Sequence, residues 1–252
     1  MGTSNGYGMP TGGDWTPLKI AATSFVKDIG QGSVTPKNLL GNYLQANGGA
    51  QAMAQGRGGI SGRGSGWYQI GSSAKKTGTK FGGFLSGVAA KGLDATLKDA
   101  GLVHLIGKPA TEVCAGLLEA FTSAANTLDD HATRTALSNI LTDLFNPDAS
   151  YEDIEQLLNQ AIDDKGLMTV MGNFFGYYLY ELFCRDFYEV WQKKVGAEQT
   201  RRSLHQVKKC IFADVESKLV KKDIHSFDWS GPEGASLVEQ VMQDTLEIFE
   251  VV

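Results

Sequence analysis

The stretch "GLMTVMGNFFGYYLYELFCRDFYEVWQKKVG", residues 166–196, is the most apolar part of the chain and predicts a central helix. Asn173 and Glu181 interrupt the apolar run, and charged residues follow it. This pattern favours a helix buried in a protein core over a transmembrane helix, which needs about 20 predominantly apolar residues. We therefore expect the rest of the fold to be arranged around this segment.

Further helices are predicted on both sides of it. Downstream, residues 198–222 and 234–252 have helical patterns, and upstream residues 109–126 carry a stripe with a period of 3.6 residues. Asp129 and Asp130 suit the first turn of a helix over 128–145, and Ser150 with Asp153 resembles a capping box before 151–163. No convincing strand pattern or internal repeat is present. We predict an all-α domain of about seven to nine helices.

The front part of the chain is less regular. Thr16 followed by Pro17 and Thr35 followed by Pro36 each predict a helix start. Residues 55–66, "QGRGGISGRGSG", are too glycine-rich for helix or strand and predict a mobile loop. In the segment that follows, Gly78, Gly82 and Ser86 are spaced by four, as are Gly83 and Gly87. Two interpretations stay open: a helix whose small residues permit close packing, or two short helices that break near Gly82.

Charge and glycine content divide the chain. Residues 1–110 contain 11 Lys or Arg against 4 Asp or Glu, whereas residues 111–252 contain 12 against 24. Of the 31 glycines, 22 precede residue 93. We predict a flexible glycine-rich arm at residues 1–15, a basic glycine-rich helical region at 16–108 and an acidic helical core domain at 109–252. The net charge of −5 argues against a general nucleic-acid binder.

Cysteine use and the chain start indicate a cytoplasmic protein. Cys114, Cys184 and Cys210 are far apart, odd in number and set in apolar helical patterns, which favours buried thiols over a disulfide framework. Residues 1–15 lack the basic start and apolar run of a signal peptide. We expect no membrane association.

The usual catalytic signatures are missing from the sequence. It contains no phosphate-loop motif, no G-x-S-x-G elbow, no H-E-x-x-H helix and no C-x-x-C pair. The four histidines stand singly, and Asp129 and Asp130 are better explained by the helix dipole than by a carboxylate pair. We therefore expect no enzyme, no metal and no bound cofactor.

Two basic features have alternative interpretations. Arg57, Arg63 and Trp67 resemble an arginine–glycine segment, which can contact single-stranded nucleic acid, although loop or protein contact is favoured. The runs at 201–209 and 218–222 predict a solvated helix face, with docking of an acidic partner as the alternative.

The N-terminus, "MGTSNGYGMPTGGDWTPL", has no hydrophobic pattern before its first Trp. Removal of the initiator Met exposes the α-amine of Gly2, whose reference pKa of roughly 7.7–8.0 leaves an appreciable neutral, nucleophilic fraction. Glycine has no Cβ, so it can enter a narrow active site without steric cost. The arm is therefore physically suited to be a tethered substrate, and an unstructured end without a role is the alternative.

This opening, the Arg/Gly/Ser-rich stretch at 55–66 and "AKKTGTKFGGFLSGVAAKGLDATLKDAGL" together resemble the QatB family of the Qat anti-phage defence system. The likeness continues through "LIGKPATEVCAGLLEAF" and weakens to scattered positions such as "YELFCRD". Met9 stands where the family favours Gly, a departure that leaves Gly2 untouched.

The resemblance implies a role as a modified substrate and adaptor. Qat systems encode an ATPase (QatA), a QueC-like enzyme (QatC) and a TatD-like nuclease (QatD), and QueC-type enzymes activate the carboxylate of a 7-deazaguanine with ATP. The Gly2 amine would attack that carboxylate and carry a covalent 7-deazaguanine. The partner's channel would read five other arm residues: Thr3, Ser4, Tyr7, Gly8 and Pro10. Two alternatives are an adaptor that bridges the ATPase and nuclease through its helical body, and a nucleic-acid-binding subunit that uses the basic front.

Overall fold

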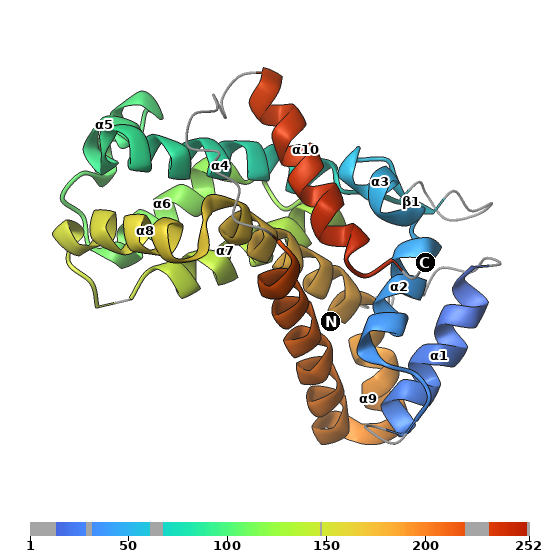
Figure 1. Cartoon of the computed structure of the whole chain (residues 1–252). Coiled ribbons are helices and arrows are strands. Elements are labelled where there is room, and N and C mark those ends of the chain that lie inside the picture. Colours follow the sequence, from blue (N-terminus) through green and yellow to red (C-terminus); the bar gives the residue numbers. More distant parts are fainter. Residues whose placement is uncertain (1–13, 29–31, 61–67, 147, 220–231, 251–252) are drawn as a thin grey trace.

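The computed structural model describes residues 14–28, 32–60, 68–146, 148–219 and 232–250, which form the arrangement of helices in Figure 1. The all-α prediction is confirmed. The described residues contain ten α-helices, against the predicted seven to nine, because the short α3 and α5 are too brief to show a period. The elements are α1 (Trp15–Lys27), α2 (Pro36–Ala46), α3 (Gly49–Ala54), β1 (Gly58–Ile60), β2 (Tyr68–Ile70), α4 (Ser72–Lys91), α5 (Leu93–Asp99), a 3₁₀ turn (Val103–Leu105), α6 (Ala110–Phe121), α7 (Leu128–Leu144), α8 (Tyr151–Lys165), α9 (Leu167–Lys218) and α10 (Pro232–Glu247).

The central apolar segment forms the first arm of α9, as predicted, and is buried along most of residues 167–187. Gly196, with φ +80° and ψ +169°, interrupts the helical backbone and separates this arm from a second one, so that α9 folds as a hairpin. The two arms of α9 pack closely at Gly176, because this residue has no Cβ. A Cβ there would lie 3.0 Å from Ile211. Helices α1, α2, α4, α7, α8 and α10 all pack on α9, which makes it the centre of the fold.

Helix α4 is continuous from Ser72 to Lys91, so the interpretation of two short helices is wrong. The glycines serve close packing instead. A Cβ at Gly78 would lie 3.0 Å from the ring of Phe175 and 3.1 Å from Val238, and one at Gly87 would lie 2.9 Å from Thr96. Packing against α5, α9 and α10 offsets the low helix propensity of these glycines, which costs up to about 1 kcal/mol each.

The prediction of a mobile loop over 55–66 is wrong for residues 58–60, which form β1 and pair antiparallel with β2, and residues 61–66 lie outside the described residues. The register places Gly58 opposite Ile70 and Ile60 opposite Tyr68. Glycine is tolerated in this strand because the backbone of Met53 lies against it: a Cβ at Gly58 would approach Met53 Cα to 3.0 Å. The outer edge of β1 is bonded too, since the Gly59 N–H donates to the carbonyl of Asn47 over 2.9 Å.

Most predicted helix starts are confirmed. Thr35 accepts a hydrogen bond of 3.1 Å from the backbone N–H of Asn38 at the start of α2, and Ser150 with Asp153 forms a capping box on α8. The prediction for Thr16 is wrong. Helix α1 begins at Trp15, with Asp14 at the cap position and no side-chain cap, because burial of Trp15 rather than a cap fixes this end.

Charged residues of the basic front pair with acidic residues from later in the chain. Lys75 on α4 pairs with Glu239 on α10, and Lys37 on α2 pairs with Asp214 on α9 at 3.2 Å. Buried apolar residues of both parts also belong to a single cluster. The boundary at 108/109 stays a prediction. None of the helices described here is long and apolar enough to cross a membrane.

Candidate functional site

The base of the N-terminal arm is fixed by Trp15. Its side chain is 2% exposed, and its indole N–H donates a hydrogen bond of 3.0 Å to the carbonyl of Ala46 at the end of α2. The ring also meets that of Tyr43 edge to face, with centroids 6.1 Å apart. The residue at the base of the N-terminal arm, Trp15, is therefore held by both polar and apolar contacts.

Tyr43, which contacts Trp15, connects the base of the arm to the buried ion pair between Arg185 and Asp186. The Tyr43 hydroxyl donates a hydrogen bond of 2.7 Å to Oδ2 of Asp186, which Arg185 binds through Nε and a second guanidinium nitrogen at 2.8 and 2.9 Å. The Asp186 side chain is fully buried and that of Arg185 is 16% exposed. A buried carboxylate is tolerated here because it accepts several hydrogen bonds and faces a positive charge. The hydrogen bond from Tyr43 to Asp186 ties α2 to α9.

Two other parts of the chain form hydrogen bonds with the turn between α2 and α3 and with the first residues of α3. Asn47 in the turn accepts the hydrogen bond from β1, and the N–H of Ala50 donates to Glu250 over 2.6 Å near the C-terminal end. The arm base, the β hairpin and the end of the described chain thus meet at residues 46–50. We call this region the α2–α3 corner.

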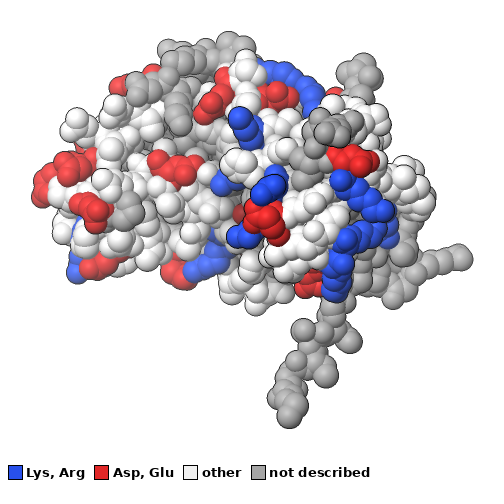
Figure 2. Space-filling view, turned by 90° about the horizontal axis from the view of Figure 1, so that it is seen from below, with Lys and Arg blue, Asp and Glu red and all other residues white. Residues whose placement is uncertain are grey.

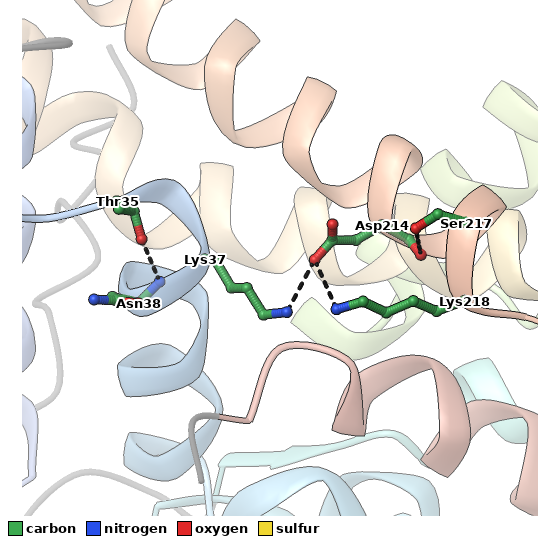
Figure 3. A network of polar contacts seen from close by, with 6 residues as sticks. All are labelled: Thr35, Lys37, Asn38, Asp214, Ser217 and Lys218. Atoms are coloured by element: carbon green, nitrogen blue, oxygen red, sulfur yellow. Dashed lines mark hydrogen bonds and ion pairs between the residues drawn. The ribbon is translucent and has the colours of Figure 1, made fainter.

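A second attachment of α2 to α9 lies at the other end of α2 (Figure 3). Oδ2 of Asp214 accepts from the ammonium groups of Lys37 at 3.2 Å and Lys218 at 3.3 Å. The three side chains are 26–43% exposed, so solvent screens the pair and its contribution is modest. This contact positions α2 against α9.

Asp129 and Asp130 bind the N-terminus of α4 as well as starting their own helix. Asp129, 3% exposed, accepts from the backbone N–H of Gly71 at 3.1 Å and of Ser73 at 2.8 Å, and from the hydroxyl of Tyr178. Asp130 accepts from the Ser73 hydroxyl and forms the capping box with Thr127. The prediction that these carboxylates serve helix dipoles is confirmed, and they serve two helices rather than one.

Burial and hydrogen bonding set the acidity of these groups. Burial and then the neighbouring Asp129 carboxylate raise the pKa of Tyr178, so this hydroxyl keeps its proton and donates. Partial burial opposes ionisation of Asp130, but hydrogen bonds from Ser73 and Thr127 hold its pKa below the usual value.

The cysteines are unpaired and half-buried rather than fully buried. Burial raises the pKa of Cys114 to about 11 and that of Cys184 to about 12, so these thiols stay protonated at neutral pH. Within the described ranges, no group of three His, Cys, Asp or Glu side chains could hold a metal ion.

Most of the residues predicted to act from the arm and the loop lie outside the described residues. These are Gly2, Thr3, Ser4, Tyr7, Gly8, Pro10, Arg63 and Trp67. Arg57 is described and is exposed directly before β1, next to the α2–α3 corner. The sequence did not indicate that three residues, Trp15, Tyr43 and Asp186, would contact one another in a chain. Asp186 ends the quoted "YELFCRD", and Trp15 is the last residue of the predicted N-terminal arm.

Comparison with protein families identifies the group. Residues 62–249 match the family described as Qat anti-phage system associated protein QatB. The chain belongs to the QatB family. It is accordingly a component of an anti-phage defence system. The matched segment begins between β1 and β2, so the arm and α1–α3 precede it. No curated protein and no solved structure matches the chain.

Proposed function

We propose that this QatB-family chain is a non-catalytic protein substrate and adaptor that presents its N-terminal arm to a partner enzyme in the cytoplasm. The Gly2 α-amine attacks a 7-deazaguanine carboxylate that a QueC-like partner, QatC, has activated as an acyl-adenylate. A C–N amide bond forms, AMP leaves with the electrons of the broken C–O bond, and the amine loses a proton. The ATPase and the nuclease of the system are further partners.

The observation that carries this proposal is the anchoring of Trp15 at the α2–α3 corner. Thirteen residues precede Asp14. A chain of that length spans at most about 45 Å, which is enough for the terminal amine to enter the active site of a protein bound to the body. A firmly held base lets the body define where the partner meets the arm. The protonated thiols and the dipole role of the Asp129 pair further support a substrate over an enzyme.

The test is mass spectrometry of the intact protein and its N-terminal peptide, after expression alone and with the QueC-like partner. We expect an added mass on Gly2 that depends on the partner. Gly2→Val should abolish it, because the side chain crowds the attacking amine. Gly13→Val, the same change at the base of the arm, should leave modification intact.

Three outcomes would each count against the proposal. Undiminished modification of Gly2→Val would place the acceptor elsewhere. Full phage protection after deletion of residues 2–14 would favour an adaptor that acts through its helical body alone. Nucleic-acid binding that falls steeply with salt and depends on Arg57 and Arg63 would favour the third role.

A further inference from the structure

The outer face of α1 carries a groove of about 530 Å³ that begins close to where the arm ends. We call it the α1 groove. Thr16, two residues after Asp14, lines the end of the groove at the start of α1, and Lys27 lines the end of the groove at the last residue of α1. The residues that matter for its chemistry are Lys19, Ile20, Thr23, Lys27, Asp28 and Lys194.

Ile20 is the most exposed large hydrophobic residue of the described chain, with 67% of its surface accessible. Single exposed apolar residues are common and need no explanation by themselves. Ile20 differs in its setting, because it lies within a groove whose other lining side chains are polar or charged. An apolar centre with a polar rim is the usual composition of a protein interface.

The rim of the groove is basic. Lys19, Lys27 and Lys194 line it, against the single carboxylate of Asp28. Figure 2 shows that Lys and Arg gather toward the end of the molecule where Figure 1 places α1 and α2, whereas Asp and Glu gather toward the end with α5 and α8. Charge complementarity therefore selects a partner surface that is acidic.

The helix that carries the groove is held against α9 by its opposite face. Phe25 packs against Trp191 with ring centroids 5.9 Å apart, and Gln199 donates a hydrogen bond of 2.7 Å to the carbonyl of Val26. Lys194 from α9 donates to the Thr23 hydroxyl over 2.8 Å, which fixes one wall. A preformed surface loses little conformational entropy on binding.

We propose that the α1 groove docks an acidic protein surface of the enzyme that modifies the arm, with Ile20 as the apolar contact and the lysines as the rim. This inference rests on the proposed function and names the contact that brings the enzyme to its substrate. A body contact next to the arm base makes entry of Gly2 into the active site an intramolecular step, which raises its effective concentration.

The experiment measures kcat and KM of conjugation with the full-length protein as substrate. The double variant Ile20→Glu/Lys27→Glu should raise KM about tenfold and leave kcat unchanged, because the reacting arm is intact. Salt should raise the wild-type KM toward that of the variant. Lys98→Glu is the control for charge: it lies exposed on α5, at the opposite end of the molecule, and should leave KM unchanged.

Each failure has its own signature. Absence of conjugation on the wild-type protein would overturn the proposed function. The docking proposal, which rests on that function, would then fall with it. Conjugation with the same KM in wild type and double variant would overturn the docking site alone. Circular dichroism checks folding, and Lys194→Glu, which changes the groove from α9 rather than α1, gives a second measurement with the same expected rise in KM.

Discussion

The indole N–H of Trp15 donates to the carbonyl of Ala46, a residue 31 positions further along the chain. The bond closes the last turn of α2 with a group from the first turn of α1. It also places the start of the described chain beside the turn that receives β1 and Glu250. This buried hydrogen bond and the ring contact with Tyr43 together hold Trp15 at the base of the N-terminal arm.

Trp15→Phe should lower the free energy of unfolding by about 1–2 kcal/mol more than Trp191→Phe. Both residues are almost fully buried, and both substitutions shrink the same ring. Trp191 Nε1 has no hydrogen-bond partner among the described residues, whereas Trp15→Phe leaves the Ala46 carbonyl unpaired. Urea denaturation of both variants gives the comparison, and equal losses would show that the hydrogen bond contributes nothing.

Gly71→Ala should destabilise the protein by at least about 3 kcal/mol. Gly71 has φ +99°, and a Cβ there would lie 1.8 Å from the backbone oxygen of Met53, which cannot move aside as a side chain can. Gly101→Ala is the matched control, since Gly101 has φ +74° but open space around the Cβ position among the described residues. It should cost about 1 kcal/mol, from the backbone conformation alone. Similar melting temperatures for the two variants would contradict the structure at β2.

Asp130→Asn should reduce the dependence of stability on pH under acid conditions. The pKa of Asp130 is lower in the folded protein than in the unfolded chain, so its contribution is complete above the usual aspartate pKa of about 3.9 and is lost as pH falls through the folded value. Between pH 5 and pH 3 the wild type should therefore lose more stability than the variant. Chemical denaturation at each pH measures the two slopes, and a steeper slope in the variant would give the wrong sign.

Asp214→Asn should cost up to about 1 kcal/mol at low salt, because it leaves Lys37 and Lys218 near each other without a shared carboxylate. At 1 M salt the loss should largely vanish, since the Debye length is about 3 Å. Glu198→Gln is a suitable comparison: its partners Arg201 and Arg202 lie on the same helical segment, and all three side chains are well exposed. That variant should change stability less. A loss that persists at high salt would mean that packing, not charge, holds α2 there.

The pattern of apolar residues was sufficient to predict most of the fold. The run at 166–196 forms the buried first arm of α9, and Gly196 ends it as expected. Thr35 and Ser150 act at helix starts because a cap needs only neighbours three residues away. The hairpin at β1 was missed, because glycine is a poor strand former and only the contact with Met53 and Asn47 stabilises it.

Less of the candidate site than of the fold could be predicted from the sequence. Composition singled out the arm, and the charge count singled out a basic front, but neither indicated what holds the arm base. Tyr43 meets Asp186 across 143 positions of sequence, and Ala50 meets Glu250 across 200. Residue types alone do not show which of many Tyr and Asp residues become partners.

The sequence by itself determined the long helices, most of their starts and the break at Gly196, because these depend on residues within one or two turns of each other. Only the tertiary structure decided that Trp15 closes α2, that Asp129 binds the N-terminus of a helix that precedes it in the chain, and that Lys19, Ile20 and Lys194 share one groove. Those relationships depend on how the helices pack around α9, and packing brings together side chains whose distance in sequence carries no periodic signal.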